Sequence, residues 1–168
     1  MTVTITIDGR KLLVEEGMNL LEAALQNGIY IPHLCHHPDL PDLGSCRLCL
    51  VEVEGREGVH PSCKLQASDG MVIRTRSEQI TRLRNLSMEL LLAAHPEDCS
   101  TCPKYGKCEL QTLIQYMGVS ATRMTSRIKG LKMDERNPLL VHDMNRCVEK
   151  CDIICTDKKV GMPKKRSE

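Results

Sequence analysis

Ten cysteines in a chain of 168 residues constrain this sequence more than any other feature, because they fall into three groups. The first group has the spacing C-x10-C-x2-C-x13-C and consists of Cys35, Cys46, Cys49 and Cys63. The second has the spacing H-x3-C-x2-C-x5-C and consists of His95, Cys99, Cys102 and Cys108. The third reads C-x3-C-x3-C and consists of Cys147, Cys151 and Cys155. Thiolates are soft ligands that select iron–sulfur clusters, zinc or copper(I), so we expect a chain that binds metal and carries electrons rather than one that transforms a substrate.

The composition is consistent with metal binding. The chain has no Trp, no Phe and only three Tyr, and small units with such lean cores usually need a metal site or a disulfide. A net charge of +1 gives no excess of positive charge of the kind that binds nucleic acid. Residues 1–8 lack the apolar core of a signal peptide, and no apolar run is long enough to span a membrane. We therefore expect a cytoplasmic location, where cysteines bind metal rather than form disulfides.

The first 78 residues alternate in a way that indicates strands and one helix. Strands are predicted at Thr2–Ile7, Lys11–Val14, Leu48–Glu54 and Met71–Arg76. Asp8-Gly9 is a hairpin signal between the first two strands. Asn19 is predicted to cap a helix that ends at Gly28, with Glu22 completing a capping box. A hairpin, a helix and two further strands around a Cys-bearing loop at 31–45 indicate a β-grasp arrangement.

Two further helices are predicted after the β-rich part. Ser77 is a candidate N-cap of the first, over 77–94, and its apolar residues recur at helical spacing: Ile80, Leu83, Leu86, Leu90, Leu91 and Ala94. A second helix is predicted from Lys107 to Gly118. The fold class is therefore α+β, with a β-rich unit at 1–78, a helical unit at 79–118 and a Cys-containing extension at 119–168.

The first cysteine group favours a 2Fe–2S cluster. Two cysteines separated by two residues, Cys46 and Cys49, are predicted to chelate one iron, and Cys35 and Cys63 to complete the second. Gly44 and Ser45 suit a loop whose backbone N–H groups point at sulfur, which helps to set the potential. The spacing differs from the plant-type C-x4-C-x2-C run. Four thiolates also suit structural zinc, but the β-grasp context favours the cluster.

Two stretches around this group resemble a known family. They are Ile31-Pro-His-Leu-Cys-His-His-Pro-Asp39 and Gly44-Ser-Cys-Arg-Leu-Cys-Leu-Val-Glu-Val53. Both resemble the N-terminal ferredoxin domain of the large iron–sulfur subunit of respiratory NADH dehydrogenase (complex I). The same family includes electron-transfer subunits of NAD(P)-linked hydrogenases and formate dehydrogenases, some of which bifurcate electrons. The resemblance implies a β-grasp 2Fe–2S ferredoxin domain at 1–78.

The second group is similar to the His/Cys3 segment of that family, over His95-Pro-Glu-Asp-Cys-Ser-Thr-Cys-Pro-Lys-Tyr-Gly-Lys-Cys-Glu-Leu-Gln111. The resemblance implies a small helical domain at 79–118 that binds a 4Fe–4S cluster through one His and three Cys. A neutral imidazole in place of a thiolate removes one negative charge and should raise the potential. Alternatives are a zinc site, or a His95 that only favours the negative end of a helix dipole.

The third group departs from the family pattern. Residues 137–147 resemble the lead-in to a segment with two further 4Fe–4S clusters, which would continue as C-x2-C-x2-C-x3-C. This chain has only Cys147, Cys151 and Cys155. Three thiolates could hold a third iron–sulfur cluster, with His142 or a partner's residue as fourth ligand. A zinc site or a degenerate remnant is the alternative.

Several polar residues lie near the first group in sequence, and we do not expect them to be metal ligands. His33, His36, His37 and His60 flank Cys35 and Cys63, and we expect them on exposed loops rather than on metal. Arg47 lies between two predicted ligands. Its charge would raise the cluster potential unless its side chain is solvated.

Two functions from different classes follow. The first is a non-catalytic iron–sulfur subunit that relays single electrons within a multisubunit NAD(P)-linked oxidoreductase. The chain has no G-x-G-x-x-G fingerprint and no room for a nucleotide-binding domain, so flavin and NAD(P) would belong to one partner and a further catalytic or iron–sulfur site to another. The second is a zinc-stapled interaction module without a redox role. Metal and sulfide analysis separates the two.

Overall fold

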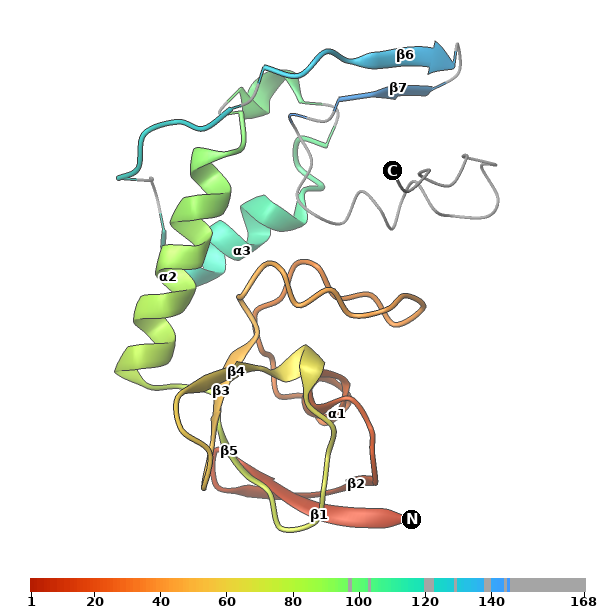
Figure 1. Ribbon diagram of the computed structural model, residues 1–168, viewed down its shortest axis with the longest axis vertical. Helices are drawn as coiled ribbons and strands as arrows, with labels where there is room; N and C mark the ends of the chain where they lie inside the picture. The colour runs from red at the N-terminus through yellow and green to blue at the C-terminus, as the bar shows by residue number, and fades with distance from the viewer. Residues whose placement is uncertain are drawn as a thin grey trace.

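The computed structural model describes residues 1–96, 98–102, 104–119, 123–128, 130–137, 140–143 and 145. Its N-terminal part is a five-stranded mixed sheet with the order β2-β1-β5-β3-β4 (Figure 1). The strands are β1 (Thr2–Ile7), β2 (Arg10–Glu15), β3 (Leu50–Val53), β4 (Val59–Pro61) and β5 (Val72–Arg74). Together with the helices described below, this sheet confirms the predicted α+β class.

The first hairpin follows directly from the sequence. β1 pairs antiparallel with β2, from Thr2 opposite Glu15 to Ile7 opposite Arg10. Asp8 and Gly9 both have positive φ, 48° and 81°, as a two-residue hairpin turn of this hand requires. β1 also pairs in parallel with β5, where Ile7 lies opposite Ile73. The two ends of the first 78 residues therefore meet at the centre of the sheet.

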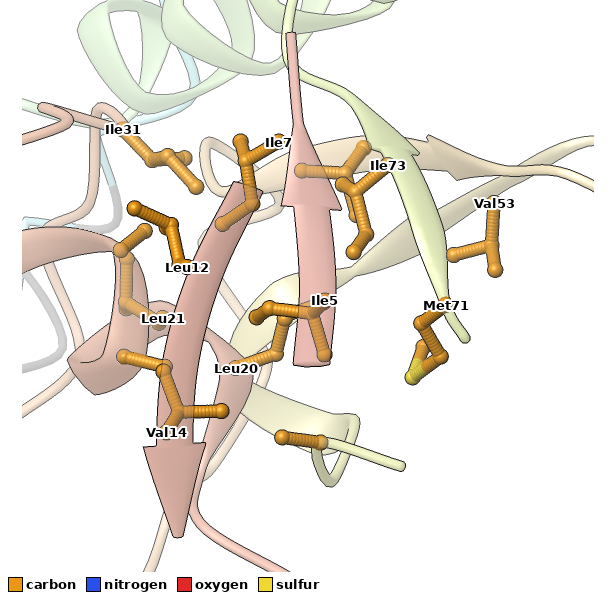
Figure 2. Packing of buried hydrophobic residues seen from close by; sticks show 14 of the residues in the cluster. Ile5, Ile7, Leu12, Val14, Leu20, Leu21, Ile31, Val53, Met71 and Ile73 are labelled. Carbon is orange, nitrogen blue, oxygen red and sulfur yellow. The ribbon is translucent and has the colours of Figure 1, made fainter. Parts of the chain in front are cut away.

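One helix covers the buried face of the sheet. It is α1 (Leu20–Gln26), and the side chain of Asn19 caps it by accepting hydrogen bonds from the N–H groups of Leu21 and Glu22. Figure 2 shows side chains from α1 packing against those of β1, β2 and β5. The members with no exposed surface include Ile5, Ile7, Leu20 and Leu21. The alternating apolar positions of β1 thus point to one side and form this first core.

Two longer helices follow the sheet. In α2 (Glu78–Ala93), Ser77 Oγ accepts a hydrogen bond of 3.1 Å from the N–H of Ile80, as a capping serine does. α3 (Glu109–Met117) ends at Gly118, whose φ of 68° is in the left-handed region. Figure 1 shows α3 lying beside α2, above the orange loop that follows α1. Both helices were predicted from periodicity, and both are confirmed.

Helix α2 buries only part of the apolar positions that its periodicity indicates: Ile80 is fully buried and Leu91 packs against the buried residues around Met88. Leu86 and Leu90 are 41% and 47% exposed. The buried positions of the helix are Ile80, Arg84, Met88, Glu89 and Ala93. The reason is that two buried positions are charged residues that find polar contacts, so a count of apolar residues alone misses part of the buried face.

Short elements were not predicted. β4 pairs antiparallel with β3, which begins at Leu50 and not at Leu48. Two single-turn 3-10 helices, η1 (Ser62–Lys64) and η2 (Cys99–Thr101), contain predicted ligand cysteines. A separate two-stranded sheet joins β6 (Asp134–Asn137) to β7 (Leu140–His142). Within the part of the chain that the structure describes, no helix is both long and apolar enough to cross a membrane.

Candidate metal centres

The first cysteine group lies together inside the fold. Cys35 follows α1, Cys46 and Cys49 precede β3, and Cys63 belongs to η1. All four are free thiols with only 2–3% of their surface exposed. The pairing of β3 with β4 brings the last two close, and the N–H of Ser62 donates a 2.8 Å hydrogen bond to the Cys49 carbonyl. Four cysteines from three stretches of the chain thus lie together beside the sheet.

The sulfur atoms are grouped in two pairs. Cys35 Sγ and Cys46 Sγ are 3.3 Å apart, and the Cys49 and Cys63 side chains are hydrogen-bonded to each other. The C-x2-C spacing instead predicted that Cys46 and Cys49 bind the same iron. That pairing rested on proximity in sequence, whereas the fold brings each of these cysteines next to a thiol from another stretch.

Hydrogen bonds favour thiolates in each pair. The Cys46 side chain, with backbone and side-chain groups of Ser45, lowers the pKa of Cys35 to about 4 against the opposing effect of burial. The Cys63 and Ser62 side chains lower the pKa of Cys49 to about 6. The partner thiols, which share their protons with these anions, have raised pKa values. Four buried sulfurs cannot all be ionised without a cationic group between them, so this donor set fits a metal cluster.

The backbone of the loop also surrounds the sulfurs. N–H groups of Ser45 and Cys46 bond to the Cys35 sulfur, and that of Leu48 bonds to the Cys46 sulfur. Gly44 has a φ of 66°, and a Cβ there would lie 3.1 Å from Lys64 Cγ. The expectation that backbone N–H groups point at sulfur is therefore met at Ser45. Arg47 has an exposed side chain, which supports the solvated alternative.

A hydrogen-bond network connects this loop to α1. The Asn19 side chain, besides capping α1, donates 2.8 Å bonds to Asp42 Oδ2 and to the Cys63 carbonyl. Asp42 Oδ1 lies 2.5 Å from His36 Nδ1, and Glu22 Oε1 lies 3.6 Å from His36 Nε2. His36 is only 7% exposed, so its predicted exposure was wrong. Sequence reasoning missed this network because its members are up to 44 residues apart.

The second group lies between α2 and α3. His95 follows the last residue of α2 and its C-cap, Cys99 begins η2, and Cys108 is the N-cap of α3. The three thiols, including Cys102, are free and half-buried. His95 Nδ1 lies 2.9 Å from the Pro96 carbonyl. A ring that donates its Nδ1 proton in this way keeps the Nε2 lone pair available for a metal.

Neither group is a preformed mononuclear site. Among the residues that the structure describes, no three His, Cys, Asp or Glu side chains converge as ligands of a single metal ion. The assignment of individual ligands in both groups therefore stays a prediction. The third group, Cys147, Cys151 and Cys155, lies outside the described residues.

One apolar cluster connects the first two groups. It contains Cys35 and Cys46 from the first group, and Cys108 from the second packs against it. Its other buried members are Leu34, Leu48, Met88, Leu110, Leu113 and Val119. We call this set the bridging core. Tyr30 and Tyr116 also meet edge to face, with ring centroids 4.8 Å apart. The segment that leads into the Cys35 loop is therefore also in contact with α3.

A β-grasp-like sheet with four buried thiols at one end, followed by a His/Cys3 helical segment, defines an iron–sulfur protein. Two family descriptions match the chain: "2Fe-2S iron-sulfur cluster binding domain" over residues 1–78, and "NADH-ubiquinone oxidoreductase-G iron-sulfur binding region" over residues 84–123. The chain thus carries a 2Fe–2S domain and a 4Fe–4S region.

Known proteins are similar to this chain over most of its length. It is 38% identical to NADP-reducing hydrogenase subunit HndD of Solidesulfovibrio fructosivorans, over 91% of this chain and 27% of that protein. It is 37% identical to the mitochondrial NADH-ubiquinone oxidoreductase 78 kDa subunit of Candida albicans, over 87% and 21%. A chain in a crystal structure of an NAD+-reducing [NiFe]-hydrogenase is 37% identical, with a TM-score of 0.85 over 94% of this chain and 67% of that one.

The chain belongs to the iron–sulfur family that includes the 78 kDa subunit of NADH-ubiquinone oxidoreductase and subunits of NAD(P)-linked hydrogenases. This membership confirms the resemblance that the cysteine motifs indicated. The chain spans only about a fifth to a quarter of the length of the curated relatives. What those relatives do as whole proteins therefore enters only as a proposal.

Proposed function

We propose that this chain is a small electron-transfer subunit of a multisubunit NAD(P)-linked oxidoreductase, of hydrogenase, formate dehydrogenase or transhydrogenase type. The observation that carries the proposal is the bridging core, because it contains Cys35 and Cys46 of the first site and packs against Cys108 of the second. Two redox centres joined by a packed apolar layer would form a relay for single electrons. Each bound cluster supplies reversible one-electron chemistry.

The chain's own residues have distinct roles in this proposal. The sulfur pairs Cys35/Cys46 and Cys49/Cys63 would each hold one iron of the 2Fe–2S cluster. The N–H groups of the loop would stabilise negative charge on sulfur, and the network around Asn19 and Asp42 would hold the loop in place. His95, with Cys99, Cys102 and Cys108, would hold the 4Fe–4S cluster.

The partners follow from what the chain lacks. The pocket beside β3 and β5 and the pocket between β2 and α1 are both open to solvent, and the sequence has no nucleotide fingerprint. A flavin- and NAD(P)-binding subunit would deliver electrons one at a time, and a further catalytic or iron–sulfur subunit would receive them. Ten cysteines placed at ligand spacing suit a reducing compartment such as the cytoplasm.

The test begins with the purified chain under anaerobic conditions. We expect a brown protein with iron, acid-labile sulfide and the EPR signals of a 2Fe–2S and a 4Fe–4S cluster on reduction. We also expect no NADH oxidation until a flavin-bearing subunit is added. A colourless protein with stoichiometric zinc would overturn the proposal and support the zinc-stapled module. NADH oxidation by the chain alone would overturn the proposal that flavin and NAD(P) bind to a partner subunit.

A further inference from the structure

Helix α2 buries one positive charge for which the described structure offers no counter-ion. Arg84 is only 9% exposed. Its Nη2 donates a 2.6 Å hydrogen bond to the Leu50 carbonyl, and its Nε has no hydrogen-bond partner. Within the described part of the chain, none of the ion pairs involves this guanidinium. A buried ion is costly unless an opposite charge compensates it.

The other buried charged residue of α2, Glu89, forms an ion pair within the protein. Glu89 is 8% exposed, and the guanidinium of Arg123 bonds to both of its carboxylate oxygens, the closest pair being 3.0 Å apart. One buried charge on α2 thus has a protein partner of opposite sign. The contrast shows that no side chain of the described residues forms an ion pair with Arg84 as Arg123 does with Glu89.

The position of Arg84 points to the first cysteine group. Its hydrogen-bond acceptor, Leu50, directly follows Cys49, a predicted ligand of the first site. Burial lowers the pKa of Arg84, and a negative charge on Cys49 is the largest of the influences that raise it. Four thiolates around an oxidised 2Fe–2S core of charge plus two leave a net charge of minus two. Among the acidic groups that act on this guanidinium, the first-site thiol has a larger influence than Tyr116 or Asp8.

We infer that Arg84 is the buried counter-charge of the 2Fe–2S cluster, held on the Leu50 carbonyl so that it stabilises the reduced state of the site. The inference rests on the proposed ligand set of the first site. Reduction by one electron, supplied by an external donor, changes the charge of the site from minus two to minus three, with no bond made or broken and no proton taken up. A fixed cation nearby favours that change and raises the potential.

The test compares charge with hydrogen bonding in the anaerobically purified full-length chain. Arg84→Gln keeps an N–H donor for the Leu50 carbonyl but removes the charge, whereas Arg84→Lys keeps the charge. Arg82→Gln is the matched control, because Arg82 is on the same helix with an exposed side chain. Dithionite is the reductant, and the 2Fe–2S EPR signal is followed in a redox titration at two ionic strengths.

We expect Arg84→Gln to shift the equilibrium at least tenfold toward the oxidised cluster, which is ~59 mV for a one-electron couple. Arg84→Lys should keep most of the native potential, and Arg82→Gln should leave it unchanged. The Arg84 effect should persist at high salt, because buried charges are weakly screened. A native potential in Arg84→Gln, or equal shifts in Gln and Lys, would overturn the inference and assign Arg84 a structural role. Absence of any 2Fe–2S signal from the unsubstituted chain would overturn the proposed function as well.

Discussion

The two cysteine sites differ in how much of the fold surrounds them. At the first site, the four sulfurs come from three stretches of chain and are almost fully buried, and long-range hydrogen bonds hold the surrounding loop. At the second, the cysteines are half-buried, and the local backbone hydrogen bonds join neighbours such as Cys102 and Cys99. The first site is thus part of the domain core, while the second is an ordered turn between two helices.

This difference indicates how each cluster is controlled. A buried site has its potential set by fixed charges and N–H groups of its own domain. A half-exposed site is partly open to solvent and to whatever docks there, so its potential depends more on its surroundings. We therefore expect loss of the first cluster to damage the fold of residues 1–78, and loss of the second to leave that domain folded.

The largest effect should come from removing a ligand at each site. Cys49→Ser should abolish the 2Fe–2S EPR signal and destabilise residues 1–78, because the cluster organises the loop that joins Cys35 to Cys49. Cys102→Ser should abolish only the 4Fe–4S signal. Iron content, EPR and hydrogen exchange of the first domain are the measurements. If Cys49→Ser kept its iron and its spectrum, the ligand assignment would be wrong.

The next effect concerns the bridging core. Met88 is fully buried there, and Met88→Ala should lower the free energy of unfolding by about 2–5 kcal/mol. Leu90→Ala is the control on the same helix, because Leu90 is 47% exposed and such changes usually stay within about 0.5 kcal/mol. Denaturation of the cluster-bound chain measures both. Equal losses would mean that the two sites do not share a packed layer.

The second site can be tested through its histidine. His95→Cys should retain a 4Fe–4S cluster and lower its potential by ~100 mV, because a thiolate adds a negative charge. His95→Ala should reduce cluster occupancy. Redox titration followed by EPR gives the potential. A native potential in both variants, with full occupancy, would show that His95 only ends helix α2.

The smallest effect should come from the network around the first site. Asn19→Ala removes the cap of α1 and the bonds to Asp42 and Cys63, and should cost about 1–3 kcal/mol. Asn27→Ala is the control, because the Asn27 side chain donates its 2.8 Å bond only within α1, to the Ala23 carbonyl. Chemical denaturation compares the two. An equal loss in both variants would contradict a role of this network in supporting the cluster loop.

The sequence predicted the elements whose causes are local. β1 begins and ends where its alternation indicates, and Ser77 caps α2 as predicted. The apolar periodicity of α2, however, missed two of its buried positions, because Arg84 and Glu89 are buried through contacts with Leu50 and Arg123. The partners in each contact are 34 residues apart in sequence, so the local periodicity of the helix cannot predict these contacts.

The first site likewise has features that the local sequence predicted and features that depend on contacts between distant segments. The motif identified the cysteines of the first group, but the way their sulfurs pair depends on the β3–β4 pairing and on the loop that carries Cys35. β4 was missed because it has only three residues, one of which is Pro61. The burial of His36 depends on Asp42 and Glu22, which approach it only in the folded chain.

The central position of β5 has a consequence for how the protein matures. This strand lies between β1 and β3, yet it is the last strand of the sheet to be synthesised. The β1–β2 and β3–β4 hairpins form from nearby residues, but they join only when residues 72–74 insert between them, and such long-range pairing is slow. Until then, the β1–β2 hairpin is not joined through the sheet to the β3–β4 hairpin, whose two ends adjoin Cys49 and Cys63. Iron and sulfide that reach the cysteines before residues 72–74 are synthesised would therefore meet a sheet that is still open.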